Sequence, residues 1–302
     1  MKCPLCHSEN VEGARYCVPC GFRLRQDQDM CEAETKISAE PTDRLGPGSI
    51  FAGRYKIIED LGSGRTGRVF KAIDAKINET VALKIILPEI AADSGIIERL
   101  PNAFQAASKL SHPNICRVHL LGQEKETTYI IMDYVQGENL KSMIQMTKRL
   151  RLGTIVRLAQ QICAGLAEAH RQGVMHGGLK PANILVGQDG NARIVDLGTG
   201  AAAIPGTPEY MSPEQAEGQE PDQRSDIYSL GVILYEMVTG VVPFQGGSRP
   251  EILAKQINDL PVPPRAIHPD LPDSLSRVIL KCLQKIKDIS TQINSRYDYM
   301  SH

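Results

Sequence analysis

The sequence predicts an α+β protein in which a strand-rich part precedes a helical part and a small cysteine-rich module precedes both. Apolar and polar residues alternate between Tyr55 and Ile85, as they do in half-buried strands. Further along the chain, Ile155, Leu158 and Ile162 recur at the spacing of one helical face. The third observation is a pair of CxxC units close to the N-terminus.

The two CxxC units have ten residues between them. This segment is too small to bury a hydrophobic core of its own, whereas four thiolates complete the closed tetrahedral shell of a structural Zn(II) site. Closing that shell supplies the free energy of folding that the segment otherwise lacks. We therefore predict a zinc ribbon over residues 1–25, with zinc held by Cys3, Cys6, Cys17 and Cys20.

The role of this ribbon stays open among a stable N-terminal module, a protein-docking module and a nucleic-acid reader. Basic residues of the segment are few, and Glu9 and Glu12 oppose them. Nucleic acid is the least favoured partner, because a nucleic-acid reader carries a basic patch. His7 could replace one cysteine as a ligand, but four cysteines already complete the site, so we interpret His7 as solvent-facing.

The composition is that of an ordinary soluble protein and indicates the cytoplasm. Of 302 residues, 42% are hydrophobic and 23% are charged, and the net charge of -1 creates no field that would attract nucleic acid or an anionic membrane. Cysteines outside the CxxC units are scattered singly, as in a reducing compartment, and no secretory signal follows Met1. The best membrane candidate, residues 230–244, is short and interrupted by Glu236, Gly240 and Pro243, so we expect a buried helix and no membrane span.

Residues 26–50 separate the ribbon from a second domain. Their composition shifts to Asp, Glu, Ser, Thr, Pro and Gly, with few large apolar side chains. Such a segment buries too little apolar surface to fold alone, so we predict a flexible linker. The second domain then covers residues 51–302.

A glycine-rich loop lies between the first two predicted strands of this domain, at Gly62, Gly64 and Gly67, and Val69 follows it. Walker and Rossmann glycine loops instead open a helix, so this loop is of a different type. Glycines at these positions let backbone amides approach phosphates closely. The next predicted strand carries the run VALK, which ends at Lys84.

Two further motifs follow the helix that we predict at residues 154–171. The run HGGLKPAN extends from His176 to Asn183, and Asp196 opens the run DLG thirteen residues later. In order and spacing, the glycine loop, VALK, HGGLKPAN and DLG resemble the signature set of the eukaryotic-like, bacterial-type serine/threonine protein kinases. The resemblance covers approximately residues 51–283.

This resemblance implies a two-lobed kinase fold behind the ribbon. The small, strand-rich lobe would cover residues 51–132, the hinge residues 133–137, and the larger helical lobe residues 138–302. The match weakens from residue 285 onward, so the end of the large lobe is expected to be truncated or altered. The resemblance also implies that the domain binds ATP with Mg(II).

Carried over position by position, the resemblance implies a role for each retained polar residue. Lys84 would hold the α and β phosphates, and Lys180 would steady the moving phosphoryl group. Asn183 and Asp196 would hold Mg(II). The residues expected to line the nucleotide are Gly62, Gly64, Gly67, Val69, Ala82, Met132, Asp133, Val135 and Leu185.

The catalytic loop departs from the family where proton chemistry is expected. Gly178 stands in place of the aspartate that orients the substrate hydroxyl, and Gly177 in place of an arginine that in many relatives binds an activation-segment phosphate. Loss of a positioned general base typically slows a reaction roughly 10²- to 10⁴-fold, or by about 3–5.5 kcal/mol of barrier. Phosphoryl transfer depends mainly on positioning and electrostatics, so this predicts slow turnover rather than none.

A second departure affects Lys84, whose partner in the family is a glutamate on the following helix. That position falls on Ala103, and the nearest acid, Glu98, lies on a different helical face. Pro101 intervenes, so we expect the helix to restart there and Lys84 to be less well held.

Together these departures favour a catalytically impaired, pseudokinase-like protein that binds ATP and Mg(II) and acts as a signalling scaffold or nucleotide sensor. A low-activity serine/threonine kinase is the first alternative. A zinc-ribbon interaction protein with an empty kinase-fold pocket is the second. Whether the chain is an enzyme stays open, and no motif identifies its signalling partners.

Overall fold

A computed structural model describes residues 2, 9, 45–147, 150–198 and 206–285. The chain forms two compact units, Met1–Leu45 and Gly46–His302. In the first unit, Lys2 and Glu9 are described and form an antiparallel bridge. The predicted zinc ligands lie outside the described residues: Cys3, Cys6, Cys17 and Cys20.

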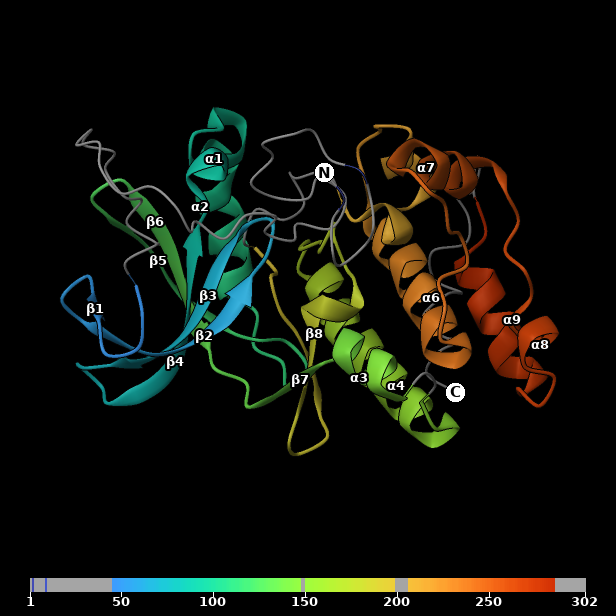
Figure 1. Ribbon diagram of the computed structural model, residues 1–302, viewed down its shortest axis with the longest axis horizontal. Helices are drawn as coiled ribbons and strands as arrows, with labels where there is room; N and C mark the ends of the chain where they lie inside the picture. The colour runs from blue at the N-terminus through green and yellow to red at the C-terminus, as the bar shows by residue number, and fades with distance from the viewer. Residues whose placement is uncertain (1, 3–8, 10–44, 148–149, 199–205, 286–302) are drawn as a thin grey trace. The chain divides into compact units, whose positions relative to one another are not determined.

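The second unit begins with a six-stranded antiparallel sheet, the strand-rich lobe in Figure 1. Its spatial order is β1-β2-β3-β4-β6-β5. The alternation of apolar residues predicted three of these strands, and Tyr55, Ile57 and Phe70 are all buried. The strands are β1 (Ile50–Phe51), β2 (Tyr55–Ser63), β3 (Gly67–Asp74), β4 (Glu79–Ile86), β5 (Val118–Glu124) and β6 (Thr127–Asp133).

The pairing of β3 with β4 is regular and sets the glycine loop beside the VALK lysine. Val69 on β3 pairs directly with Lys84 on β4. Gly67 opens β3, and a Cβ at this position would lie 2.1 Å from the carbonyl oxygen of Ile85. Glycine at position 67 is therefore needed for the close approach of the two strands.

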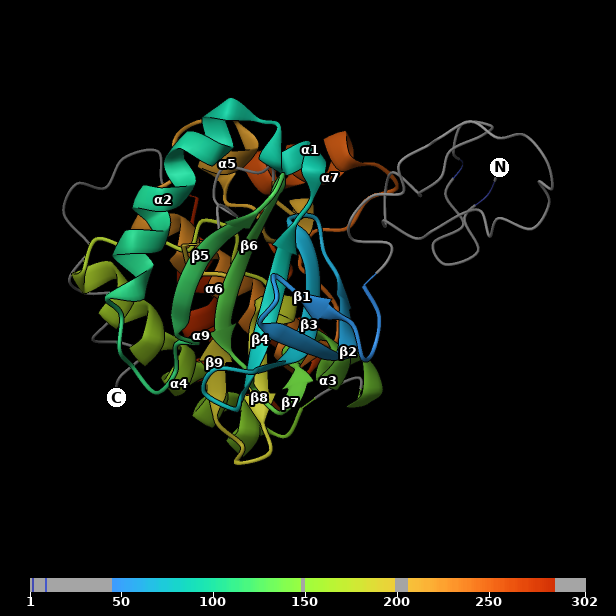
Figure 2. The same ribbon diagram turned by 90° about the vertical axis from the view of Figure 1, so that its left-hand side faces the viewer.

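Two helices, α1 (Pro88–Ala91) and α2 (Ser94–Ser108), follow β4, and α2 runs beside β5 (Figure 2). Asp93 caps α2 by accepting a backbone hydrogen bond of 3.2 Å. The predicted restart of the helix at Pro101 is wrong, because α2 continues through this residue. One lost backbone hydrogen bond is tolerated here since the cap and buried residues such as Leu100 hold the helix in place.

The helical lobe is built around α6, in which every residue from Ser225 to Thr239 is buried. The helix ends at Gly240, whose φ of 79° lies in the left-handed region that glycine adopts without strain. The apolar run around residue 230 is therefore core, and no helix among the described residues is long and apolar enough to cross a membrane. The helices of this lobe are α3 (Leu140–Thr147), α4 (Leu152–Arg171), α5 (Pro213–Ala216), α6 (Gln223–Thr239), α7 (Arg249–Asn258), α8 (Pro264–Ile267) and α9 (Asp273–Cys282).

A second, three-stranded sheet lies at the start of the helical lobe and has the order β7-β8-β9. Asp189 lies in the turn between β8 and β9. Short 3₁₀ turns flank this region at Pro181–Asn183 (η1) and Pro208–Tyr210 (η3). The strands are β7 (Gly137–Asn139), β8 (Ile184–Gly187) and β9 (Ala192–Ile194).

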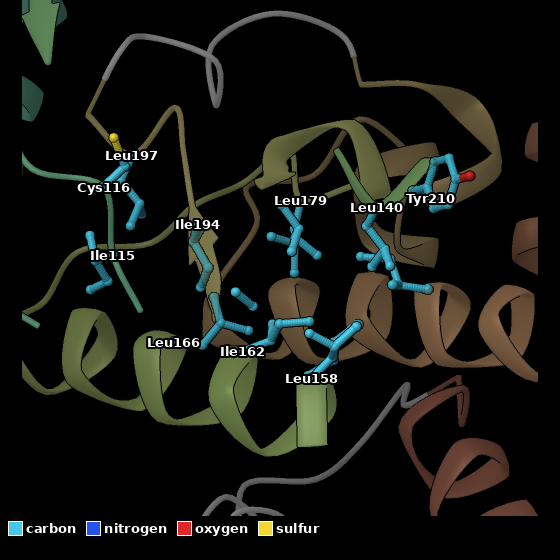
Figure 3. Close-up of a cluster of buried hydrophobic side chains, with 14 of the residues drawn as sticks. Ile115, Cys116, Leu140, Leu158, Ile162, Leu166, Leu179, Ile194, Leu197 and Tyr210 are labelled. Atoms are coloured by element: carbon cyan, nitrogen blue, oxygen red, sulfur yellow. The ribbon is translucent and has the colours of Figure 1, made fainter. Parts of the chain in front are cut away.

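The predicted helical face at residues 154–171 supports this sheet from below. Figure 3 shows Leu158, Ile162 and Leu166 of α4 beneath Leu179 and Ile194. All five side chains are buried and belong to one hydrophobic cluster. The segments that carry the polar motifs are thus fixed to the core by the apolar residues beside them.

Candidate functional site

Three polar side chains from separate segments meet beside β4. Lys84 lies on β4, Asn183 ends η1, and Asp196 follows β9. Lys84 Nζ lies 2.6 Å from Asp196 Oδ1, and Asn183 Nδ2 donates a hydrogen bond of 3.3 Å to Asp196 Oδ2. Lys84 and Asn183 are only 2% and 5% exposed, so water competes little for these contacts. We call Lys84, Asn183 and Asp196 the Lys84 cluster.

Asp196 is held as a carboxylate in an unusual backbone conformation. Burial disfavours its charge, but the ammonium group of Lys84 outweighs burial, so the pKa of Asp196 lies below its ordinary value. Its φ of 69° lies in the left-handed region, where a residue other than glycine is disfavoured by about 1 kcal/mol. Such strain persists where surrounding contacts impose it, and it is concentrated at functional sites.

Apolar contacts on either side fix these polar residues in place. Leu179 and Leu197 are almost fully buried and belong to the hydrophobic cluster above α4 (Figure 3). Gly198 lies against α2, where an added Cβ would be 2.3 Å from the Cβ of Ala107 and 2.7 Å from the carbonyl oxygen of Ala103. Only glycine fits this contact, and α2 therefore packs directly on the backbone that follows Asp196.

Lys84 has an ion-pair partner in this structure, although the helix glutamate of the family is missing. Ala103 supplies no carboxylate from α2, and Glu98 is exposed, so the helix provides no ion-pair partner of the family type. Lys84 instead pairs with Asp196. A carboxylate from the DLG motif thus takes the place of the missing helix glutamate as the partner of this lysine.

The catalytic loop is anchored through its backbone by a buried carboxylate on α6. Asp226, only 1% exposed, accepts hydrogen bonds of 2.8 Å from the backbone N–H groups of both His176 and Gly177. Nε2 of His170 lies 2.8 Å from the same carboxylate. Asp226 therefore holds the backbone of the catalytic loop in place. The φ of 67° at Gly177 also suits glycine.

The ring of His176 is engaged on both sides by the backbone. Its Nε2 lies 3.1 Å from the carbonyl oxygen of Val195, and its Nδ1 accepts a hydrogen bond of 3.3 Å from the N–H of Gly178. With both nitrogens in structural contacts, the ring organises the loop and is not placed as a base. Gly178 itself brings only backbone groups to the position of the family aspartate.

A second group of charges lies around the segment that leads into η3. Lys180 Nζ is 3.5 Å from Thr207 Oγ1, while Arg65 Nη1 and Arg249 Nη1 donate to the carbonyl oxygen of Gly206 at 3.1 and 3.0 Å. We call Arg65, Lys180 and Arg249 the cation cluster. Burial lowers the pKa of Lys180, and the positive charge of Arg65 lowers it further.

The sequence predicted only Lys180 of these three cations. Arg65 lies inside the glycine-rich loop, in a position where the motif specifies no side chain. Arg249 belongs to no recognised motif, and a sequence pattern cannot show that the fold brings it beside residue 65. The basic residue at position 65 of the glycine loop was the only feature of the sequence that could have indicated this cluster.

The structure also shows the surroundings of the residues expected to line a nucleotide. Gly62 has a φ of 119° and open space where a Cβ would point, and its N–H is fixed by Asp60 Oδ1 at 2.9 Å. Buried Ala82 and Met132 pair across β4 and β6. The others lie in the loop between β2 and β3, on β3, near the hinge and on β8: Gly64, Gly67, Val69, Asp133, Val135 and Leu185.

A polar groove of about 410 Å³ opens between the hinge and the turn of the second sheet. Its lining includes Asp133 and Val135 but none of the Lys84 cluster, so it is distinct from the place where that cluster meets. The residues that line it are Thr80, Asp133, Tyr134, Val135, Gln136, Gly187, Gln188, Asp189 and Arg193.

The donor set of the Lys84 cluster fits Mg(II), since Asp196 offers carboxylate oxygens and Asn183 offers an amide oxygen. Among the described residues, no group of three or more His, Cys, Asp or Glu side chains is arranged to hold a metal ion. The predicted zinc site falls on residues outside this part of the chain. Mg(II) at the cluster would therefore need further oxygen ligands from phosphate or water.

Comparison with protein families yields a match over most of the chain. The profile described as "Protein kinase domain" matches residues 55–294. A probable serine/threonine-protein kinase of Clostridium acetobutylicum is 36% identical over 79% of this chain, and PrkC of Bacillus subtilis is 33% identical over 83%. The matched regions cover only 38% and 42% of those two proteins, so the chain spans about two fifths of the relatives' length.

Solved structures match the fold closely. The PknI kinase domain of Mycobacterium tuberculosis aligns with a TM-score of 0.70 and 26% identity. The alignment covers 85% of this chain and 97% of that domain. The two-lobed architecture implied by the sequence motifs is thereby confirmed.

Proposed function

Because the chain belongs to the protein kinase domain family, we propose that it binds ATP with Mg(II) and transfers the terminal phosphoryl group slowly to serine or threonine hydroxyls. The observation that carries this proposal is the Lys84 cluster. Its lysine, amide and carboxylate come from three segments and lie within hydrogen-bonding distance, although α2 supplies no glutamate. Preorganisation of this kind is what phosphoryl transfer requires most.

Separate residues would bind the phosphates, bind Mg(II) and orient the phosphoryl group. Lys84 would hold the α and β phosphates, with the backbone amides of the glycine loop above them. Asp196 and Asn183 would hold Mg(II), which would neutralise charge on the phosphate oxygens. Lys180 would contribute positive charge beside Thr207, on the side of the site that faces the segment at residue 206.

Proton transfer is the step for which this loop lacks a side chain. Gly178 cannot accept a proton, so the substrate hydroxyl must lose its proton to water or to another group. Loss of a general base typically costs about 3–5.5 kcal/mol of barrier. The serine/threonine kinases among the relatives favour this low-activity kinase over the scaffold that the sequence alone favoured.

A nucleotide-binding pseudokinase that acts as a signalling scaffold or sensor is the second candidate. Its support is the absence of side-chain chemistry at Gly177 and Gly178, together with Ala103 on α2. Under either candidate, the N-terminal zinc ribbon over residues 1–25 and the linker over residues 26–50 are proposed to connect the domain to a cytoplasmic protein partner.

Two measurements on the full chain separate these candidates. Thermal melting with millimolar ATP and Mg(II) should raise Tm under both, since a ligand that binds only the folded state stabilises it. The labelled terminal phosphoryl group of ATP should then be transferred slowly to the protein itself or to a generic basic protein. Lys84→Met, which keeps the apolar stem of this buried side chain, should abolish the transfer. No melting shift would remove both candidates, while a shift without transfer would leave only the scaffold.

A further inference from the structure

The glycine loop is entered through an irregular end of β2. The pairing of β2 with β3 shifts register between Asp60 and Gly62, so Leu61 is passed over in the ladder. Gly62 follows this bulge directly and has a positive φ of 119°. A bulge beside a glycine-rich turn specifies the pairing only weakly, so contacts other than the ladder must set the course of the loop.

Asp60 supplies two of these contacts with one carboxylate. Its Oδ1 accepts a hydrogen bond of 2.9 Å from the N–H of Gly62. Its Oδ2 accepts bonds of 3.0 and 2.6 Å from Nε and Nη2 of Arg68, which lies on β3 and pairs with Ser63 across the loop. The carboxylate therefore ties the two strands together where the glycine loop begins and ends.

The contacts of Asp60 favour its ionised form. Partial burial disfavours the charge, but the hydrogen bonds from Arg68 and Gly62 outweigh burial, so the pKa of Asp60 lies below its ordinary value. The guanidinium group of Arg68 also lies 5.1 Å from the centre of the buried ring of Phe70. One partner of the ion pair is thus held against the core of the strand-rich lobe.

We infer that Asp60 is a positioning residue for the proposed nucleotide site, because it sets the course of the glycine loop before a nucleotide binds. A second contact, from the N–H of Gly64 to the carbonyl oxygen of Gly67 at 2.8 Å, closes the loop itself. A loop that is already ordered loses less conformational entropy when phosphates bind to it. The inference rests on the proposed function and adds a residue that lies outside the glycine motif.

A simple charge effect and a positioning role predict opposite results when Asp60 is replaced. The phosphates of ATP are anionic, so a carboxylate near them repels them, and its removal would strengthen ATP binding. If Asp60 positions the glycine loop, its removal weakens ATP binding instead. The sign of the change in affinity therefore separates the two roles.

The first test uses the full chain without nucleotide, so it does not depend on ATP binding. Hydrogen exchange at the amide of Gly62, followed by NMR, should be at least about tenfold faster in Asp60→Ala than in the wild type, because the acceptor of this N–H is lost. Asp60→Asn keeps an oxygen that can accept the bond and should show an intermediate rate. Equal rates in the wild type and Asp60→Ala would overturn the inference.

The second test compares ATP with adenosine, which has no phosphates, by isothermal titration calorimetry in the presence of Mg(II). Asp60→Ala should weaken ATP binding about three- to tenfold and Asp60→Asn should weaken it less, while the affinity for adenosine stays within about twofold of the wild type. The Tm of both variants should stay within about 2 °C of the wild type, because an exposed ion pair adds little to global stability. A merely structural role would instead lower both affinities together.

Glu251 provides the matched control in the helical lobe. Its carboxylate also accepts a glycine N–H, that of Gly247 at 2.9 Å, and also pairs with a cation, Lys255, at 2.8 Å. Glu251→Ala should leave both affinities unchanged. Unchanged or tighter ATP binding by Asp60→Ala, an equal loss for adenosine, or an equal loss in Glu251→Ala would overturn the inference. No ATP binding by the wild type would instead remove the proposed function, and this inference with it.

Discussion

The Lys84 cluster and residues 176–178 of the catalytic loop are the two halves of the proposed site, and they differ in what each retains. The Lys84 cluster keeps its side chains, which contact one another at 2.6 and 3.3 Å. The loop keeps its backbone anchors to Asp226 at 2.8 Å, but it presents glycine where the family has an arginine and an aspartate. Scaffold and chemistry are thus separable in this fold, since the loop backbone keeps its anchor while Gly177 and Gly178 bring no reactive side chain.

The largest expected effect comes from removing the loop's anchor. Asp226→Ala leaves buried donors on His176, Gly177 and His170 without their acceptor. Unpaired buried donors cost about 1–3 kcal/mol each, so we expect the free energy of unfolding to fall by about 3–5 kcal/mol. Urea denaturation measures this loss.

Asp273→Ala is the matched control for this experiment, because Asp273 is an exposed acid on α9. It should change the free energy of unfolding by less than about 0.5 kcal/mol. If Asp226→Ala were no more destabilising than the control, the loop would not depend on this anchor. The claim that the backbone of the catalytic loop stays anchored although its side chains are missing would then be wrong.

The next effect concerns the Lys84 cluster. Lys84→Met should weaken ATP binding about tenfold to a hundredfold, because a charge-assisted contact with phosphate is lost from a buried position. Isothermal titration calorimetry with ATP and Mg(II) measures the affinity. Gly178 lies in the other half of the site, so changes there should leave this affinity within about threefold of the wild type.

Lys56→Met provides the control, since Lys56 is an exposed lysine on β2. Its affinity for ATP should equal that of the wild type. Undiminished binding by Lys84→Met would show that the Lys84 cluster is not the phosphate site. The assignment of the two halves would then be wrong.

The smallest effect lies outside both halves, in the pair formed by Arg54 and Asp74. Arg54 donates two hydrogen bonds to Asp74, at 2.8 and 2.7 Å, and this contact lowers the pKa of Asp74. Because the folded pKa is depressed, the pair adds stability above the unfolded pKa near 3.9 and loses it as the pH falls through the folded value. Asp74→Asn should lower Tm at pH 7 by about 1–3 °C.

This difference in Tm between Asp74→Asn and the wild type should shrink as the pH falls from 5 toward 2, as differential scanning calorimetry can follow. A difference that stays constant over this range would mean that the charge of Asp74 plays no part. The ion pair between Arg54 and Asp74 could then not be compared with the charged contact between Lys84 and Asp196.

Much of this architecture could be predicted from local sequence pattern. Alternation at residues 55–85 indicated strands, and the helical spacing of Ile155, Leu158 and Ile162 indicated α4. The order and spacing of the glycine loop, VALK, HGGLKPAN and DLG also indicated the two-lobed fold. These features depend on periodicity or on fixed spacing, which a sequence displays directly.

The features that escaped prediction depend on contacts between distant segments. Pro101 indicated a helix break, but the cap and the tertiary packing of α2 outweigh one lost hydrogen bond. Loss of the helix glutamate suggested a poorly held Lys84, whereas Asp196 takes up its charge. Arg65 and Arg249 meet only because the two lobes close on each other at Gly206.

Restoring the missing aspartate tests the central claim most directly, namely that binding is assembled while proton transfer lacks its side chain. The φ of Gly178 lies outside the left-handed region, so Gly178→Asp is compatible with the backbone. Turnover of labelled ATP by this variant should rise about a hundredfold or more, while the affinity for ATP stays nearly unchanged. Gly153→Asp, an exposed change in the first turn of α4, should have no effect. Wild-type turnover already equal to that of Gly178→Asp would contradict the account.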